Sequence, residues 1–273
     1  MFDHKDLFAI ALILLGVSSA GLLHAGIIFE GSMTQEKTAQ PGERYRGTFV
    51  LRNTESSPAE AKLFQTDYTF SADGNNEFGE RGKSQRSNAN WVSLSRELVS
   101  IPANGIERID YEVTVPTGQG AGFSGTYWSL IMVELIDKAS RESAQERPEG
   151  AAQINQITRY GVQVVTHIGR AGSVGLSFAN PQIIKKEENR LFAIDVENSG
   201  QRWLIPSLSL ELYSQEGSAM GKFQGPATRL YPGTSARFEM DLGQVPNGKY
   251  LGLVVADGTG DNLFGANVEL DIE

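Results

Sequence analysis

The clearest pattern of apolar and polar residues lies between positions 90 and 136, where it predicts three successive β-strands. Residues 91–98 and 106–115 alternate between apolar and polar side chains, which is typical of a strand with one buried and one solvated face. Residues 125–136 form an almost unbroken apolar run, which is typical of a central strand buried on both faces. The pattern therefore predicts an antiparallel β-sandwich built around this unit.

Similar patterns extend the predicted sandwich in both directions along the chain. Residues 45–53 and 59–70 predict two further strands before the central unit, and residues 157–168 predict one after it. The polar residues 71–89 predict a long surface loop or a hairpin. Residues 137–153 are charged and poor in apolar side chains, so we expect a mobile loop before the last strand.

The glycine-rich residues 169–172 are the expected joint between two domains. Beyond them, short strands alternate with turn residues at the spacing of a second sandwich. The expected fold class is therefore all-β, with two tandem immunoglobulin-like β-sandwich domains over residues 26–170 and 171–273.

The two halves show a faint internal similarity. Each contains a strand that ends in asparagine at a turn, in LRNTESS around Asn53 and in VENSGQR around Asn198. Each also has a Gly-x-Tyr entry into an apolar strand, at Tyr127 and at Tyr250. A tyrosine at the start of the penultimate strand is typical of the tyrosine corner of such sandwiches.

Residues 1–25 resemble a secretory signal peptide. The apolar run 7–17 is too short to span a bilayer comfortably, and small residues follow it. The start of the chain carries no net positive charge, so an uncleaved anchor or a buried strand stays open. No cysteine follows the run, which excludes a lipoprotein. We expect a periplasmic or secreted mature chain without stable membrane insertion.

Composition narrows the class of function. The 273-residue chain has no cysteine, and its net charge of −9 becomes −8 when residues 1–25 are removed. An acidic chain without a basic stripe argues against nucleic acid as a partner. Of the three histidines, only His167 lies beyond residue 25. One histidine without any cysteine cannot form a multi-histidine zinc site or a Cys–His dyad. We expect no enzymatic activity, metal or cofactor, although a carboxylate pair for glycoside hydrolysis stays open because its spacing is spatial.

Three features resemble chemical motifs but have simpler interpretations. Residues 120–125 match G-x-G-x-x-G but open a strand rather than a helix, which favours a turn over a nucleotide site. Residues 257–261 offer oxygen atoms to calcium yet lack a complete binding loop, so a hairpin turn is the preferred interpretation. Trp91, Trp128 and Trp203 are expected to pack in cores, with Trp91 the best candidate for a surface that stacks on sugars.

The order of the strand and turn motifs resembles a known family. The motifs NWV, IPANG, YEVTVP, GTYWSLIMVE and RYGVQVVTHIG follow the order of the first domain of PapD-like periplasmic chaperones, over roughly residues 26–170. The same region is similar to the peptidoglycan-binding domain of WxL-interacting surface proteins. The first resemblance implies a non-enzymatic chaperone or assembly factor for surface-fibre or envelope protein subunits. The second implies a structural module that binds peptidoglycan or a surface protein.

The PapD-like resemblance also implies partner-binding residues. In that family the final strand pairs with a subunit that lacks a strand, and its apolar side chains fill the groove of the subunit. This role falls on Tyr160, Val162 and Val164, unless these side chains face their own core. A basic pair holds the terminal carboxylate of the subunit in the family, which implies Lys37 and Arg170 here, unless both are solvated surface charges.

Overall fold

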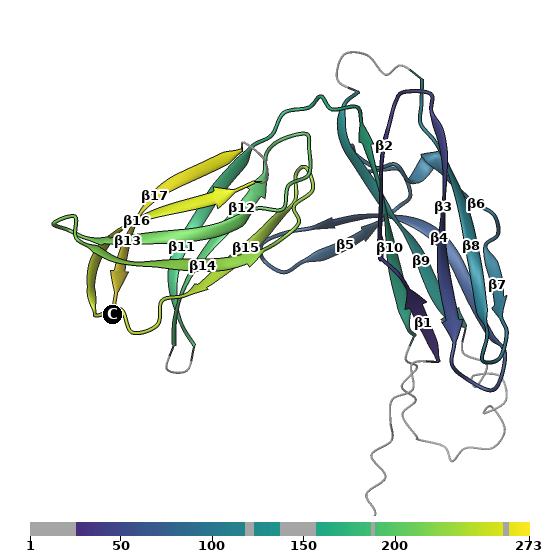
Figure 1. Cartoon of the computed structure of the whole chain (residues 1–273), viewed down its shortest axis with the longest axis horizontal. Helices are drawn as coiled ribbons and strands as arrows, with labels where there is room; N and C mark the ends of the chain where they lie inside the picture. Colours follow the sequence, from purple (N-terminus) through teal and green to yellow (C-terminus); the bar gives the residue numbers. More distant parts are fainter. Residues whose placement is uncertain (1–25, 118–122, 137–156, 187–188, 259–261) are drawn as a thin grey trace, which may run out of the picture.

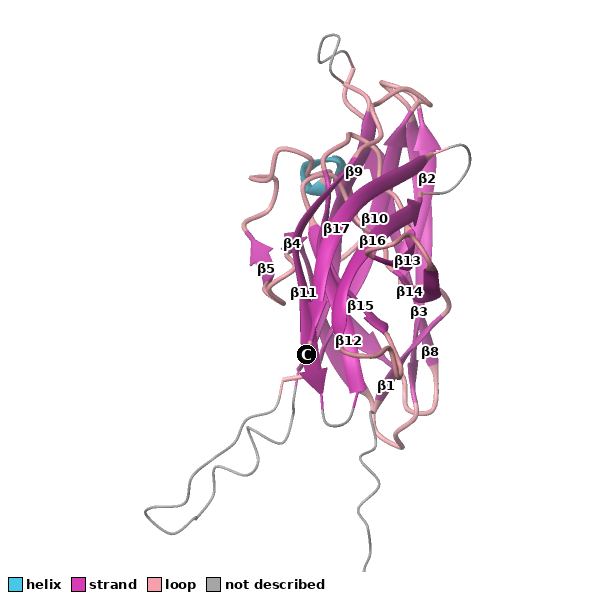
Figure 2. Ribbon diagram, turned by 90° about the vertical axis from the view of Figure 1, so that its left-hand side faces the viewer, coloured by secondary structure: helices cyan, strands magenta, loops and turns pink. Residues whose placement is uncertain are grey.

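The computed structural model describes residues 26–117, 123–136, 157–186, 189–258 and 262–273. These residues form two β-sandwiches, as the sequence predicts (Figure 1). A single 3₁₀ turn, Ala89–Trp91, is the one helical element among the described residues, and it stands out from the strands in Figure 2. None of the described helical structure is long and apolar enough to cross a membrane. The expected signal peptide, the expected loop 137–153 and parts of the two turn motifs lie outside the described residues.

The first sandwich packs a four-stranded sheet against a second sheet around a core that includes Phe49, Leu63 and Ile131. The first sheet has the order β1 (Ile27–Glu30), β3 (Arg44–Asn53), β8 (Ile106–Thr114) and β6 (Val92–Leu94). The second has the order β2 (Thr34–Ala39), β10 (Arg159–Ile168), β9 (Gly125–Ile136), β4 (Ala59–Phe70) and β5 (Asn76–Gly79), with β7 (Leu98–Ile101) also paired to β4.

One strand prediction is confirmed by the structure, and another is wrong. Strand β9 is the predicted central strand, and it is buried on both faces from Gly125 to Val133. The prediction of one strand over residues 91–98 is wrong, because the chain divides there between the two sheets. Val92 on β6 and Val99 on β7 are both buried in the core, and the exposed residues 95–97 make the crossing between them.

The first strand region also crosses between the sheets, and this crossing defines the edge of β10. Strand β1 pairs with β3 in the first sheet. At Gly31 the backbone adopts φ 97°, a conformation that favours glycine, and the chain then enters β2 in the second sheet. Strand β2 runs parallel to β10 and pairs with Gln163–Ile168. The first part of β10, Arg159–Val162, therefore extends beyond the start of β2.

The second sandwich has its own core, which includes Phe192, Leu210 and Phe238. Tyr250 donates a hydrogen bond from its hydroxyl to Pro246 O at 2.7 Å, which is the tyrosine corner predicted from the sequence. Tyr127 instead packs on Trp91. One sheet has the order β11 (Leu176–Lys186), β12 (Asn189–Asn198) and β15 (Ser235–Asp241); the other has the order β14 (Ala219–Ala227), β13 (Ser207–Ser214), β16 (Gly248–Asp257) and β17 (Leu263–Ile272).

Aromatic packing joins the two sandwiches. The rings of Trp128 and Tyr231 stack with centroids 4.7 Å apart, and Trp203 lies beside them. Residues 71–89, expected as a loop or a hairpin, begin with a hairpin in which β5 pairs with β4. Figure 1 shows this hairpin reaching toward the second sandwich, where Ala72 N–H donates to Ser235 Oγ at 3.0 Å.

Candidate binding groove and open strand edge

The first part of β10 has a backbone edge with which no described strand pairs. Gln163 N–H donates to Met33 O at 2.7 Å on the side away from β9, so the alternate residues Gly161 and Arg159 direct their N–H and C=O groups to the same side. Strand β2 begins its pairing only at Gln163. Among the residues that the structure describes, none pairs with Arg159 or Gly161 on that side. Such an edge can accept a strand of another chain.

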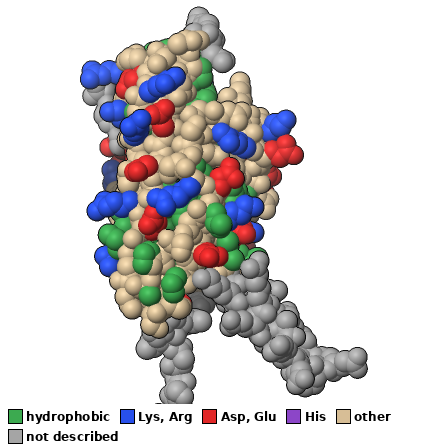
Figure 3. Space-filling model, turned by 90° about the vertical axis from the view of Figure 1, so that its right-hand side faces the viewer, with side chains coloured by type: hydrophobic (Ala, Val, Ile, Leu, Met, Phe, Trp, Pro, Cys, Tyr) green, Lys and Arg blue, Asp and Glu red, His purple; other side chains and the backbone are tan. Residues whose placement is uncertain are grey.

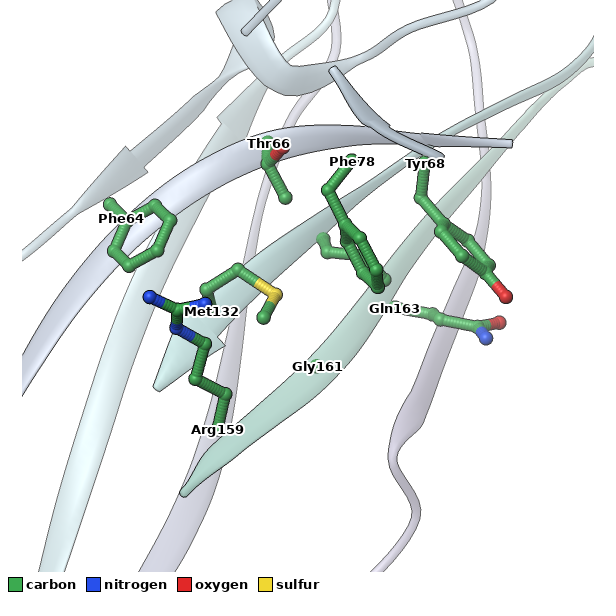
Figure 4. Close-up of a pocket in the computed structure, with 9 residues that line it drawn as sticks. Phe64, Thr66, Tyr68, Phe78, Met132, Arg159, Gly161 and Gln163 are labelled. Atoms are coloured by element: carbon green, nitrogen blue, oxygen red, sulfur yellow. The ribbon is translucent and has the colours of Figure 1, made fainter. Parts of the chain in front are cut away.

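An apolar groove of about 630 Å³ lies beside this edge, on the face of the second sheet that is turned away from the core. Figure 4 shows the lining side chains projecting into one hollow from β4, β5, β9 and β10. Leu130 and Met132 are almost fully buried in its floor, whereas Phe78 on the hairpin is 59% exposed. The lining residues are Phe64, Thr66, Tyr68, Phe78, Leu130, Met132, Arg159, Gly161 and Gln163.

Charged side chains border the end of the groove that lies near Arg159, at the start of β10. Arg159 Nε contacts Glu134 Oε2 at 2.7 Å across the β9–β10 pair, and the Arg159 side chain is about half exposed. Lys62 Nζ lies 5.8 Å from the ring centre of Phe64. An exposed ion pair of this kind contributes at most about 1 kcal/mol to stability.

The joint between the two sandwiches limits the other end of the groove, near Gln163. The Tyr231 hydroxyl donates to Gln163 Oε1, and Val165, the next outward residue of β10, is fully buried against Trp128 and Tyr231. Burial raises the pKa of the Tyr231 phenol to about 12, with Arg229 opposing this shift, so the hydroxyl keeps its proton at neutral pH. The second sandwich thus covers the outward face of β10 from Val165 onward.

A polar cluster lies within the joint. Thr126 Oγ1 accepts the backbone N–H of Trp203 at 3.0 Å and also forms a hydrogen bond with His167 Nδ1 at 3.0 Å, in which either group can donate. Glu36 Oε2 lies 3.6 Å from His167 Nε2, and its other oxygen lies 3.2 Å from Arg229. Burial lowers the pKa of His167, and nearby arginines add to this effect, whereas Glu36 opposes it.

The partner-facing side chains predicted on β10 have a different placement. Val162 and Val164 are fully buried in the core of the first sandwich, and Val164 lies where β2 already covers the edge. Tyr160 is half-buried, and its hydroxyl donates to Ile27 O. These three side chains face their own core, so the expectation that they fill a partner's groove is corrected. The outward positions of the open segment are Arg159 and Gly161.

The predicted carboxylate anchors are both exposed. Lys37 lies opposite Thr166 in the β2–β10 pairing, and Arg170 follows the end of β10. The structure brings neither into an ion pair with a described residue, and their role stays a prediction. One cation that it does place between the sandwiches is Arg229, whose guanidinium lies 4.1 Å from the ring centre of Trp203. Arg229 Nε is buried without a hydrogen-bond partner among the described residues.

The outer face of the first sandwich differs from the groove. Figure 3 shows acidic and basic side chains interspersed over this face. Arg46 on β3 pairs with Glu112 on β8 at 3.0 Å, and Arg96 pairs with Glu107 at 2.6 Å. Charges distributed in this way are typical of a solvated surface, so the groove side is the candidate interaction face.

Comparisons with known proteins give likenesses of architecture. No protein-family model and no curated protein matches the chain. It is similar to a chain from a chaperone–tip adhesin complex of CFA/I fimbriae biogenesis, with 10% identity, TM-score 0.49, and coverage of 91% of this chain and 100% of that one. It is also similar to the class 5 fimbriae chaperone CfaA (9% identity, TM-score 0.47, coverage 89% and 98%). The CupB2 chaperone of Pseudomonas aeruginosa is a further match (11% identity, TM-score 0.40, coverage 90% and 100%).

Identities near 10% and TM-scores below 0.5 assign no function to the chain. The features of this chain that point to a function are therefore the edge of β10 and the adjacent groove.

Proposed function

We propose that the chain is a PapD-like chaperone or assembly factor that binds an exported surface-fibre or envelope protein subunit. The subunit contributes an extended segment, which adds as a strand to Arg159–Val162 of β10. The observation that carries this proposal is the coincidence of the open edge with the apolar groove beside it. Main-chain groups supply hydrogen bonds in such strand addition, and pockets for alternate side chains supply selectivity.

The edge alone offers too little binding energy. The outward N–H and C=O groups of Arg159 and Gly161 can form at most four hydrogen bonds, each with a net contribution of about 1 kcal/mol. Their sum corresponds to a dissociation constant of about 1 mM. The apolar groove must therefore contribute to any tighter complex, through side chains of the added segment.

Replacement of Arg159 by proline tests the edge specifically. Arg159 is the first residue of β10 and its N–H points away from β9, so proline removes an outward donor and leaves the β9–β10 ladder intact. The matched control is Arg159→Thr, which loses the same ion pair with Glu134 but keeps the N–H. Each variant is used to capture proteins from the exported fraction of the native host, and captured proteins are identified by mass spectrometry.

We expect wild type and Arg159→Thr to capture the same subunit, and Arg159→Pro to lose at least about nine-tenths of it. Hydrogen exchange of the purified complex should show new protection of the Arg159 and Gly161 amides. Equal capture by Arg159→Pro, or protection confined to other strands, would reject the proposal. Retention on purified peptidoglycan without any protein partner would instead support the envelope-binding module.

A further inference from the structure

The open segment of β10 has no side chain over the groove at its centre. Gly161 is the outward residue between Arg159 and Gln163, and its φ lies outside the positive region that only glycine prefers. A Cβ atom there would lie 3.2 Å from Leu130 Cδ1 and 3.6 Å from Met132 Sδ, which are the flexible ends of two side chains. Backbone conformation thus does not require this glycine. A glycine within a strand often marks the close approach of a ligand or another backbone.

The space left by the missing side chain of Gly161 would lie next to any strand added at this edge. Residues directly opposite each other on neighbouring strands point to the same face. A residue of the added strand opposite Gly161 would therefore direct its side chain over the glycine, toward Leu130 and Met132. Phe64 on β4 and Phe78 on β5 line the part of the same groove that lies farther from β10.

The chemistry of the lining favours an aromatic occupant. An aromatic side chain on a neighbouring strand can cover an edge glycine and restore the missing packing. The thioether of Met132 makes favourable contacts with aromatic rings, and Phe78 offers an exposed ring for edge or offset packing. Polar groups at this point of the groove are few, because Thr66 Oγ1 already donates to Gly79 O at 2.6 Å.

We propose, on the basis of the proposed strand addition, that the groove accepts an aromatic side chain of the subunit opposite Gly161. The direction of insertion is then the reverse of the one implied by the sequence resemblance. The chain provides the cavity, and the subunit segment provides the side chain that fills it. The selected partner is an extended segment with Phe, Tyr or Trp at one outward position.

Methyl NMR of methionine reports directly on this contact. The chain has five methionines, of which Met132 lies in the groove and Met220 on the second sandwich is 37% exposed. The full chain, labelled with ¹³C at the methionine methyl groups, is titrated with nine-residue Thr-rich peptides that differ only in a central Phe or Ala. We expect both peptides to bind, with the Phe peptide about tenfold tighter. The Phe peptide should also shift the Met132 methyl signal by its ring current and leave Met220 unchanged.

Two variants separate the groove from the edge. Gly161→Val fills the gap but keeps the outward N–H and C=O, so the Phe peptide should bind about as weakly as the Ala peptide. The matched control is Gly265→Val on the edge strand β17, where a Cβ meets only ordinary contacts, and it should retain the tenfold preference. Phe78→Ser removes an exposed wall of the groove without a buried cavity, and it should reduce the preference.

The outcomes distinguish this proposal from strand addition itself. Equal binding of Phe and Ala peptides to wild type, or a Phe preference unchanged by Gly161→Val and Phe78→Ser, would overturn the aromatic occupant. Arg159→Pro would still weaken both peptides in that case, and strand addition would stand. Failure of every peptide to bind wild type, together with unchanged subunit capture by Arg159→Pro, would overturn both.

Discussion

Asn53 in the first sandwich and Asn198 in the second make the same set of hydrogen bonds. Each side-chain Oδ1 accepts the backbone N–H two residues later, at 2.9 Å in both cases. Each Nδ2 donates to the carbonyl four residues later, Ser57 at 2.8 Å and Arg202 at 2.7 Å. Each Nδ2 also donates to a distant carbonyl, Ile101 O or Leu230 O. The faint internal similarity of the sequence thus marks an equivalent turn in both domains.

Replacement of either asparagine by alanine should destabilise the protein by about 2–4 kcal/mol, because the buried carbonyl and N–H groups lose their partners. Urea unfolding monitored by circular dichroism measures the change in the free energy of unfolding. The exposed Asn267→Ala is the control, expected within about 0.5 kcal/mol of wild type. A loss below about 1 kcal/mol at both Asn53 and Asn198 would contradict the structural role of these turns.

Tyr231→Phe should cost about 1 kcal/mol of stability, because it removes the hydroxyl that donates to Gln163 at the joint but keeps the ring on Trp128. Tyr213→Phe removes a hydroxyl that donates to Glu211 at the surface and should change stability by less than about 0.5 kcal/mol. Parallel urea titrations of the two variants give the comparison. Equal effects would show that the Tyr231 hydroxyl does not hold the joint.

The joint should weaken in mild acid. Burial lowers the pKa of folded His167 below its unfolded value of about 6.5. Its contribution is therefore complete above pH 6.5 and is lost as the pH falls through the folded pKa, by at most about 1.4 kcal/mol per pH unit. Urea unfolding from pH 8 to 5 measures this slope, and His167→Gln should flatten it. An identical slope in His167→Gln would assign the effect to other groups.

Asp67 should stabilise the segment that follows β5. Burial alone would raise the pKa of this carboxyl, but hydrogen bonds from Ser84, Ser87 and the Gly82 N–H together lower it. Asp67→Asn should therefore cost about 2 kcal/mol at pH 7. The difference from wild type should shrink as the pH falls below about 4, through the folded pKa. The exposed Asp271→Asn is the control, and a matching loss there would contradict this prediction.

The sequence predicted the strands of the sandwiches better than the candidate site. The apolar run 125–136 led directly to β9. Apolar side chains occupy both faces of 157–168, however, and a one-residue change of register reverses which face is buried. Tyr160, Val162 and Val164 were therefore assigned to a partner although they fill the core.

The groove itself had no signal in the local sequence pattern. Its residues come from four strands, and Phe64 and Gly161 are almost one hundred positions apart along the chain. Alternation shows that a strand has two faces, but it does not show which part of a face a second domain covers. Arg229 and Tyr231 were missed for the same reason, since they meet β2, β9 and β10 only through the tertiary fold.

In the proposed complex, the crossing of the chain at Gly31 limits the length of the added strand. The point at which the chain crosses from the first sheet to the second determines how many residues of β10 are left without pairing to β2. If the crossing came two residues earlier, β2 would also pair with Gly161. If it came later, the open edge of β10 would extend past the end of the groove. The position of one glycine thus sets the length of the segment that the proposed strand addition can accommodate.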